Sequence, residues 1–113
     1  MQRHCLTLDL KNDPASIAEY KRYHEHVWPE VKSSLYDAGI LDMEIYLLGT
    51  RMFMILEVED TFSFAAKAKA DRENPRVQEW EQLMAGFQQE LPQARPGEKW
   101  LPMEKVFHLT QQP

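Results

Sequence analysis

Two apolar runs, LDMEIYLL at Leu41–Leu48 and MFMILEVE at Met52–Glu59, flank the connection Gly49-Thr50-Arg51 near the middle of the chain. Each run has the length and the apolar content of a β-strand. A three-residue connection that contains glycine is typical of a hairpin. The stretch therefore predicts two antiparallel strands, and the elements attached to either end of them decide the fold.

A strand and a long helical segment precede this hairpin. Arg3–Leu10 alternates along its length, which predicts a strand. Pro14, after a turn, stands at an early helical position. Pro29 is expected to kink or split the helix, because proline removes a hydrogen bond and crowds the preceding turn, and Gly39 is expected to end it. The helix carries one inward stripe at spacings of three and four residues: Ile17, Tyr20, His24, Trp28, Val31 and Leu35.

A second helical region and a last strand follow the hairpin. Asp60 or Thr61 is expected to cap an alanine-rich helix that runs to about Asp71, and Asn74-Pro75 starts the next helix. Lys99–Thr110 predicts the last strand. The stripe of the later helix contains Val77, Trp80, Met84, Phe87 and Leu91. The order strand, helix, strand, strand, helical region, strand predicts a ferredoxin-like α+β fold.

The chain of 113 residues suits one domain, residues 1–113. One sheet with helices on a single face leaves the other face open, and this second face is expected to carry Met, Tyr and acidic residues. Such a face is usually covered by a partner. The sequence therefore predicts a homodimer that closes two sheets face to face.

Composition argues against several classes of function. The net charge of −5, the pI of about 5.3 and the lack of a basic stripe argue against nucleic acid. Apolar runs such as Phe53–Leu56 are too short to span a membrane, and the start of the chain does not resemble a signal peptide, so we expect a cytoplasmic protein. Cys5 is the single cysteine, which excludes an internal disulfide and a cysteine-based zinc site.

The stretch YHEHVWPEV at Tyr23–Val31 holds two histidines, His24 and His26. At helical spacing His24 faces inward and His26 lies on the solvated side. Because residues two apart on a helix do not face each other, we expect no metal site there. His24 is either a hydrogen-bonded core histidine or a general acid or base in an aromatic-lined pocket, a role that suits a group titrating near neutrality.

Aromatic and acidic side chains form a second theme. Trp80 lies on the inward stripe with Glu81 at its edge, and Asp42, Glu44 and Tyr46 share one strand face. Sugars are bound in this way, with a ring stacked on the apolar C–H face and acids or tyrosines holding hydroxyls. The alternatives are a core tryptophan and solvated carboxylates.

Five stretches together resemble the L-rhamnose mutarotase family over nearly the whole chain. They are EYKRYHEHVWPEV (Glu19–Val31), DMEIYLL (Asp42–Leu48), FMILEVE (Phe53–Glu59), VQEWEQLM (Val77–Met84) and KVFHL (Lys105–Leu109). The resemblance implies a cytoplasmic homodimer in which ferredoxin-like sheets form a dimeric α+β barrel. It also implies interconversion of the α and β anomers of a 6-deoxy-L-sugar without a cofactor. The family's proton donor falls on His24, and its substrate-binding tyrosine falls on Tyr20.

Two departures from the family pattern fall in the implied sugar site. Rhamnose-specific members carry a tyrosine where this chain has Met43, and paired tryptophans where it has Trp80-Glu81. L-Fucose is therefore a candidate substrate beside L-rhamnose, because hydrogen-bonding sites discriminate strongly between hydroxyl arrangements. Two other hypotheses remain at this point: a cofactor-independent monooxygenase of the dimeric α+β barrel type, and a non-catalytic ligand-binding module.

Overall fold

The computed structural model describes residues 1–113 and contains the predicted hairpin. Strand β2 (Ile40–Leu48) pairs antiparallel with β3 (Arg51–Val58), with Leu48 opposite Arg51. The connection is shorter than predicted, because Arg51 already belongs to β3. Gly49 adopts a φ of 61°, in the left-handed region that glycine enters at little cost.

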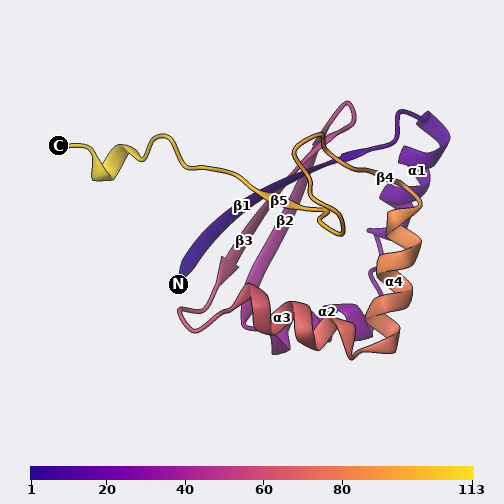
Figure 1. The fold of residues 1–113 in the computed structure, drawn as a ribbon, viewed down its shortest axis with the longest axis horizontal. Coiled ribbons are helices and arrows are strands. Elements are labelled where there is room, and N and C mark those ends of the chain that lie inside the picture. Colours follow the sequence, from indigo (N-terminus) through magenta and orange to yellow (C-terminus); the bar gives the residue numbers. More distant parts are fainter.

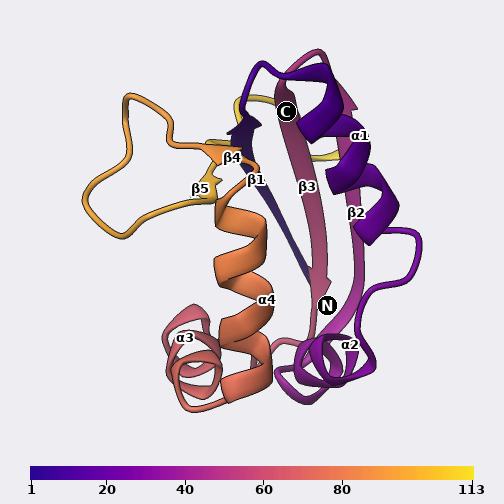
Figure 2. The ribbon, with the colours of Figure 1, turned by 90° about the vertical axis from the view of Figure 1, so that its right-hand side faces the viewer.

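The sheet has the strand order β2-β3-β1-β4, with the first strand β1 (Gln2–Leu10) in its interior. Two short strands, β4 (Gln88–Gln89) and β5 (Leu101–Pro102), both pair with β1. Figures 1 and 2 show the helices on one side of the sheet, which confirms the predicted ferredoxin-like α+β fold. None of these helices has the length and apolar character needed to cross a membrane.

The core lies between the sheet and the helices. Alternate residues of a strand point to the same face, and the helix-facing set is almost wholly excluded from solvent: Leu6, Leu8, Leu10, Met52, Met54, Leu56 and Val58. The helices contribute Tyr20, Val31, Val77, Trp80 and Met84. Full burial of one such apolar side chain stabilises the fold by about 1.5–3 kcal/mol.

The predicted break at Pro29 is confirmed. Helix α1 (Pro14–Tyr23) ends before the histidine pair, and α2 (Pro29–Asp37) begins at the proline itself. Trp28 has a ψ of 135°, the extended conformation that a following proline imposes on its neighbour. Gly39, with a φ of 93°, follows the end of α2 as predicted.

The cap predicted for the next helix is wrong. Helix α3 (Phe64–Arg72) begins after Ser63, whose hydroxyl accepts a hydrogen bond from the Ala66 N–H. Asp60 and Thr61 lie before this point, and Asp60 instead pairs with the amino terminus at 2.7 Å. Three residues in the stretch after β3 could cap a helix, so composition alone does not select one.

Helix α4 (Pro75–Ala85) begins as predicted. The Asn74 carbonyl Oδ1 accepts hydrogen bonds from the N–H groups of Arg76 and Val77. The predicted stripe, however, runs past the end of the helix. Phe87 and Leu91 lie beyond Ala85, although Leu91 is buried and Phe87 packs against the core.

The last predicted strand, Lys99–Thr110, is wrong over most of its length. Only β5 forms, followed by a hydrogen bond from the Met103 N–H to the Cys5 carbonyl at 2.8 Å. The chain then leaves the body of the molecule and ends in a short 3-10 turn, Leu109–Gln111 (Figure 1). Val106 and Phe107 are 89% and 62% exposed, because nothing in the same chain covers them.

The face of the sheet opposite the helices is open. Along β2 it presents the predicted acidic residues and tyrosine, Asp42, Glu44 and Tyr46, and along β3 it presents Phe53 and Ile55. The prediction that methionines also lie there is wrong. Successive side chains of a strand point to opposite faces, and the methionines of both strands occupy the positions that point toward the helices and the buried core.

Candidate active site

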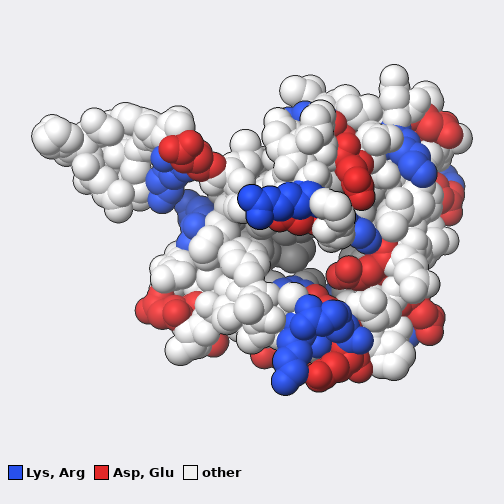
Figure 3. Space-filling view, in the orientation of Figure 1, with Lys and Arg blue, Asp and Glu red and all other residues white.

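A cavity of about 320 Å³ lies between the helix-facing side of the sheet and the helices. Its size is at the lower end of the range of small-molecule sites, about 300–1,000 Å³. Figure 3 shows the molecule hollowed, with basic and acidic side chains on the surrounding surface. Most of the lining is apolar, and the groups that can hydrogen-bond or ionise belong to Tyr20, His24, Ser34, Lys67, Trp80, Glu81, Gln88, Lys99 and Trp100.

All five residues that the sequence suggested for a site line this one cavity: Tyr20, His24, Met43, Trp80 and Glu81. They come from α1 and the residue after it, from β2 and from α4. Met43 reaches the cavity because the strand alternation turns it toward the helices, while Asp42 and Glu44 point away. Tyr46 donates a short hydrogen bond to the Glu44 carboxylate on the open face, so these acids do not contribute to the cavity.

His24 stands at the C-cap of α1, between the rings of Tyr20 and Trp80. The ring centroids are 4.3 Å and 5.5 Å from that of His24. His24 Nδ1 lies 2.8 Å from the backbone carbonyl of Tyr20. A carbonyl can only accept a hydrogen bond, so Nδ1 carries the proton. In the neutral ring the lone pair is therefore on Nε2, which can exchange a proton with a ligand. His26, by contrast, is exposed, as predicted.

Burial lowers the pKa of His24 below its ordinary value of 6.5, and the hydrogen bond to the Tyr20 carbonyl opposes this shift. Burial favours the neutral form because the imidazolium loses hydration. At neutral pH the ring is therefore mostly an unprotonated base. A core histidine satisfied at both nitrogens would lack this capacity, and the geometry favours the acid–base interpretation over the core one.

Tyr20 is 5% exposed. Burial raises its pKa to about 12, although the adjacent Gln88 side chain partly offsets the increase. The phenol therefore keeps its proton at any physiological pH. Gln88 is a cavity residue that the sequence did not reveal, because Gln88-Gln89 looked like the continuation of a helix rather than a strand.

Trp80 is both a core residue and a wall of the cavity. It is 7% exposed and meets the rings of Trp28 and Tyr23 edge-on, with centroids 5.1 Å and 6.3 Å away. These contacts fix the indole in one orientation. A rigid ring presents a defined apolar surface to whatever enters the cavity.

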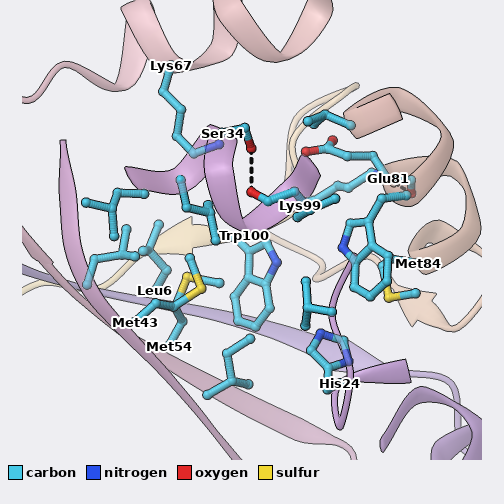
Figure 4. Close-up of a pocket in the computed structure, with 18 of the residues that line it drawn as sticks. Leu6, His24, Ser34, Met43, Met54, Lys67, Glu81, Met84, Lys99 and Trp100 are labelled. Carbon is cyan, nitrogen blue, oxygen red and sulfur yellow. Dashed lines mark hydrogen bonds between the residues drawn. The ribbon is translucent and has the colours of Figure 1, made fainter. Parts of the chain in front are cut away.

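The cavity has polar groups at two separate places. In Figure 4, Glu81, Ser34 and Lys67 lie apart from His24, and Trp100 stands between His24 and the Ser34–Lys67 end of the cavity. The Lys99 ammonium donates to the backbone carbonyl of Glu81 at 3.3 Å. The Glu81 side-chain carboxylate can accept a hydrogen bond from a ligand at a place separate from His24. The structure contains no group of three or more His, Cys, Asp and Glu side chains placed to bind a metal ion.

The fold and cavity define a ferredoxin-like α+β protein with a small-molecule site built around one basic histidine. Residues 3–109 match the family described as L-rhamnose mutarotase, and the chain belongs to that family. An L-fucose mutarotase of Xanthomonas campestris pv. campestris is 47% identical over 113 residues, covering 98% of this chain and 90% of the relative.

Two further relatives agree with this placement. An L-rhamnose mutarotase of Acidiphilium cryptum is 35% identical over 99 residues, covering 86% of this chain and 89% of its own. The crystal structure of an L-rhamnose mutarotase from Formosa agariphila superposes with a TM-score of 0.70 at 25% identity, covering 96% of this chain and 98% of that one. The monooxygenase and binding-module hypotheses receive no such support.

Proposed function

We propose that this protein is an isomerase that interconverts the α and β anomers of a 6-deoxy-L-hexose, with L-fucose as the preferred sugar. The observation that carries the proposal is His24, which offers an unpaired Nε2 to an aromatic cavity of about 320 Å³. The choice of sugar is supported by the relatives, because the L-fucose mutarotase is 47% identical and the L-rhamnose mutarotase of Acidiphilium cryptum is 35% identical.

Mutarotation needs two proton transfers. The hydroxyl on C1 loses a proton, the ring oxygen O5 gains one, the C1–O5 bond breaks, and the aldehyde turns before the ring recloses on its other face. His24 Nε2 accepts the proton from one oxygen and returns it to the other, so the ring ends the cycle neutral. General acid–base catalysis of this kind contributes about 10²–10⁴-fold, which corresponds to about 3–5 kcal/mol of barrier.

The other cavity residues would hold the sugar. The protonated hydroxyl of Tyr20 donates to a sugar oxygen beside His24, and Trp80 covers an apolar face of the ring. Met43 supplies an apolar wall suited to the C5 methyl group of a 6-deoxy sugar. Glu81 accepts a hydrogen bond from a hydroxyl at the end away from the histidine.

The test is the rate of exchange between anomers, measured by NMR in separate solutions of L-fucose and L-rhamnose. We expect the wild-type protein to accelerate exchange of L-fucose most strongly and His24→Ala to lose the acceleration while remaining folded. His26→Ala is the matched control, because His26 lies two residues away and is exposed. Acceleration that survives in folded His24→Ala would refute the role given to this histidine.

We also propose that the protein acts as a homodimer whose two sheets close face to face into an α+β barrel. The support is the open face, where Phe53, Ile55, Tyr46 and Leu48 lie uncovered or half covered. Apolar surface of this kind is usually buried against a partner. The exposed tail after β5 adds to the apolar surface that a second copy would cover.

Light scattering after gel filtration tests the dimer. Phe53→Glu places a charge in the middle of the open face and is expected to give a monomer. Tyr36→Glu is the control, because Tyr36 is 70% exposed on helix α2 and lies outside the proposed interface. A Phe53→Glu protein that remains dimeric would contradict this arrangement. The cytoplasmic location expected from the sequence stays a prediction.

A further inference from the structure

Gln88 stands at a point where the short strand β4 reaches the cavity. It lies opposite Leu10 of β1, and its neighbour Gln89 lies opposite Asp9. Because successive side chains of a strand point to opposite faces, Gln88 faces the helices and lines the cavity, while Gln89 is exposed. The two glutamines therefore have the same chemistry on the same strand, but Gln88 lines the cavity and Gln89 is exposed to solvent.

The side-chain amide of Gln88 has no hydrogen-bond partner at its carbonyl end. The same side chain lies close enough to the Tyr20 hydroxyl to lower the pKa of that hydroxyl. Its carbonyl Oε1 is buried and has no hydrogen-bond partner, and it is the single buried side-chain polar atom of the chain in this condition. Buried polar atoms are nearly always paired, so an unpaired one inside a cavity marks a place where a ligand group can bind.

The hydroxyl of Tyr20 completes the arrangement. This hydroxyl is protonated at physiological pH, so its hydrogen is available to a ligand. The cavity thus presents one hydrogen-bond donor, the Tyr20 O–H, beside one acceptor, the Gln88 carbonyl. A single sugar hydroxyl, or two neighbouring ones, can use both at once.

We propose that Gln88 is a substrate-binding residue whose carbonyl accepts a hydrogen bond from a sugar hydroxyl next to the oxygen that Tyr20 contacts. The inference rests on the proposed mutarotase function and adds a residue to its site. The backbone carbonyl of Tyr20 also fixes His24, so a sugar held by this pair lies in a defined position relative to Nε2. Gln88 then selects for the orientation of one hydroxyl.

Substitution of Gln88 by methionine tests the proposal. Methionine is unbranched and adaptable in packing, so Gln88→Met keeps the core filled while it removes the carbonyl. Gln89→Met is the matched control on the exposed side of the same strand. We expect kcat/KM for L-fucose to fall about 10- to 100-fold in Gln88→Met, the range for a lost buried hydrogen bond, and to stay unchanged in Gln89→Met.

Deoxy analogues of the sugar distinguish contact from a merely structural role. For one analogue, lacking the hydroxyl that Gln88 binds, the wild-type protein should lose about as much activity as Gln88→Met loses on the full sugar. Gln88→Met should lose little further on that same analogue, because the contact is already absent. Equal additional losses on every analogue would show that Gln88 acts only by supporting Tyr20 and would overturn the proposal.

The outcomes separate this inference from the proposed function. If the folded wild-type protein accelerated anomer exchange of neither sugar, the mutarotase function would be refuted, and the role of Gln88 with it. A wild-type protein that is active, together with a fully active Gln88→Met, would overturn the role of Gln88 alone. Thermal melts of both variants, compared with the wild type, establish that the folded protein is being assayed.

Discussion

Replacement of Tyr20 by phenylalanine removes one hydroxyl from the centre of the site and changes little else. The ring still packs against His24, at a centroid distance of 4.3 Å, and the backbone carbonyl that holds His24 Nδ1 is retained. What is lost is the hydroxyl beside the Gln88 side chain, which donates to the sugar in the proposed site. Activity should therefore fall while stability changes little.

No hydrogen bond within the chain depends on the Tyr20 hydroxyl, so its removal should change the free energy of unfolding by less than about 1 kcal/mol. Each kcal/mol lowers the Tm of a small domain by about 4–8 °C, so the Tm should stay within about 8 °C of the wild-type value. The loss of the hydrogen bond to the sugar should lower kcat/KM by about 10- to 100-fold. Because His24 keeps its hydrogen bond, the pH dependence of the remaining activity should not move.

Thermal unfolding and NMR anomer exchange measure the two effects on one sample. Tyr23→Phe is the control, because Tyr23 belongs to the same helix and packs against Trp80 and Phe87 without lining the cavity. A Tyr20→Phe protein as active as Tyr23→Phe would refute the claim that this hydroxyl binds the substrate.

Four further predictions concern pH, which has two, specificity and capping. Activity should rise with pH through a midpoint below 6.5 and then level off, because burial lowers the pKa of His24 and the neutral ring is the base; a rate that falls over this range would contradict that role. The same depressed pKa contributes stability that is present above pH 6.5 and is lost as the pH falls through the folded-state pKa, which pH-dependent thermal melts should detect. Met43→Tyr introduces the tyrosine that the resemblance implies for rhamnose-specific members at this position, so the ratio of L-rhamnose to L-fucose exchange rates should increase; an unchanged ratio would remove Met43 from the specificity argument. Asn74→Ala removes the cap that accepts hydrogen bonds from two N–H groups of α4. The free energy of unfolding, measured with denaturant, should fall by about 0.5–2 kcal/mol. Asn12→Ala, in the exposed turn before α1, is the control and should have little effect.

Elements defined by local rules could be predicted from the sequence. The hairpin, the helix start at Asn74 and the split at Pro29 each depend on a few neighbouring residues, and each forms in the structure. The alternation that buries Met52 and Met54 also turns Met43 toward the helices, but the prediction from the sequence placed methionines on the open face instead. Local chemistry was sufficient wherever one conformation was clearly favoured.

Other features depend on contacts between distant segments. The strand expected at Lys99–Thr110 has a suitable pattern, but only Leu101–Pro102 has a partner within the chain. Gln88 lies in the cavity because β4 pairs with β1, a long-range contact that no spacing along α4 reveals. The Gln88 carbonyl is left without a hydrogen-bond partner only because of how distant segments pack around it, so the sequence could not reveal it either.

The end of helix α1 helps to explain why the histidine is competent. In the middle of a helix the Tyr20 carbonyl would accept a straight hydrogen bond from the backbone N–H four residues later and retain one lone pair. At the end of α1 this backbone bond is long, 3.3 Å, and the His24 N–H is shared with the Lys21 carbonyl at 3.1 Å. The Tyr20 carbonyl therefore has capacity for His24 Nδ1 at 2.8 Å. That bond selects the tautomer that leaves the Nε2 lone pair to the cavity, so the end of α1 contributes to the basicity of His24 Nε2.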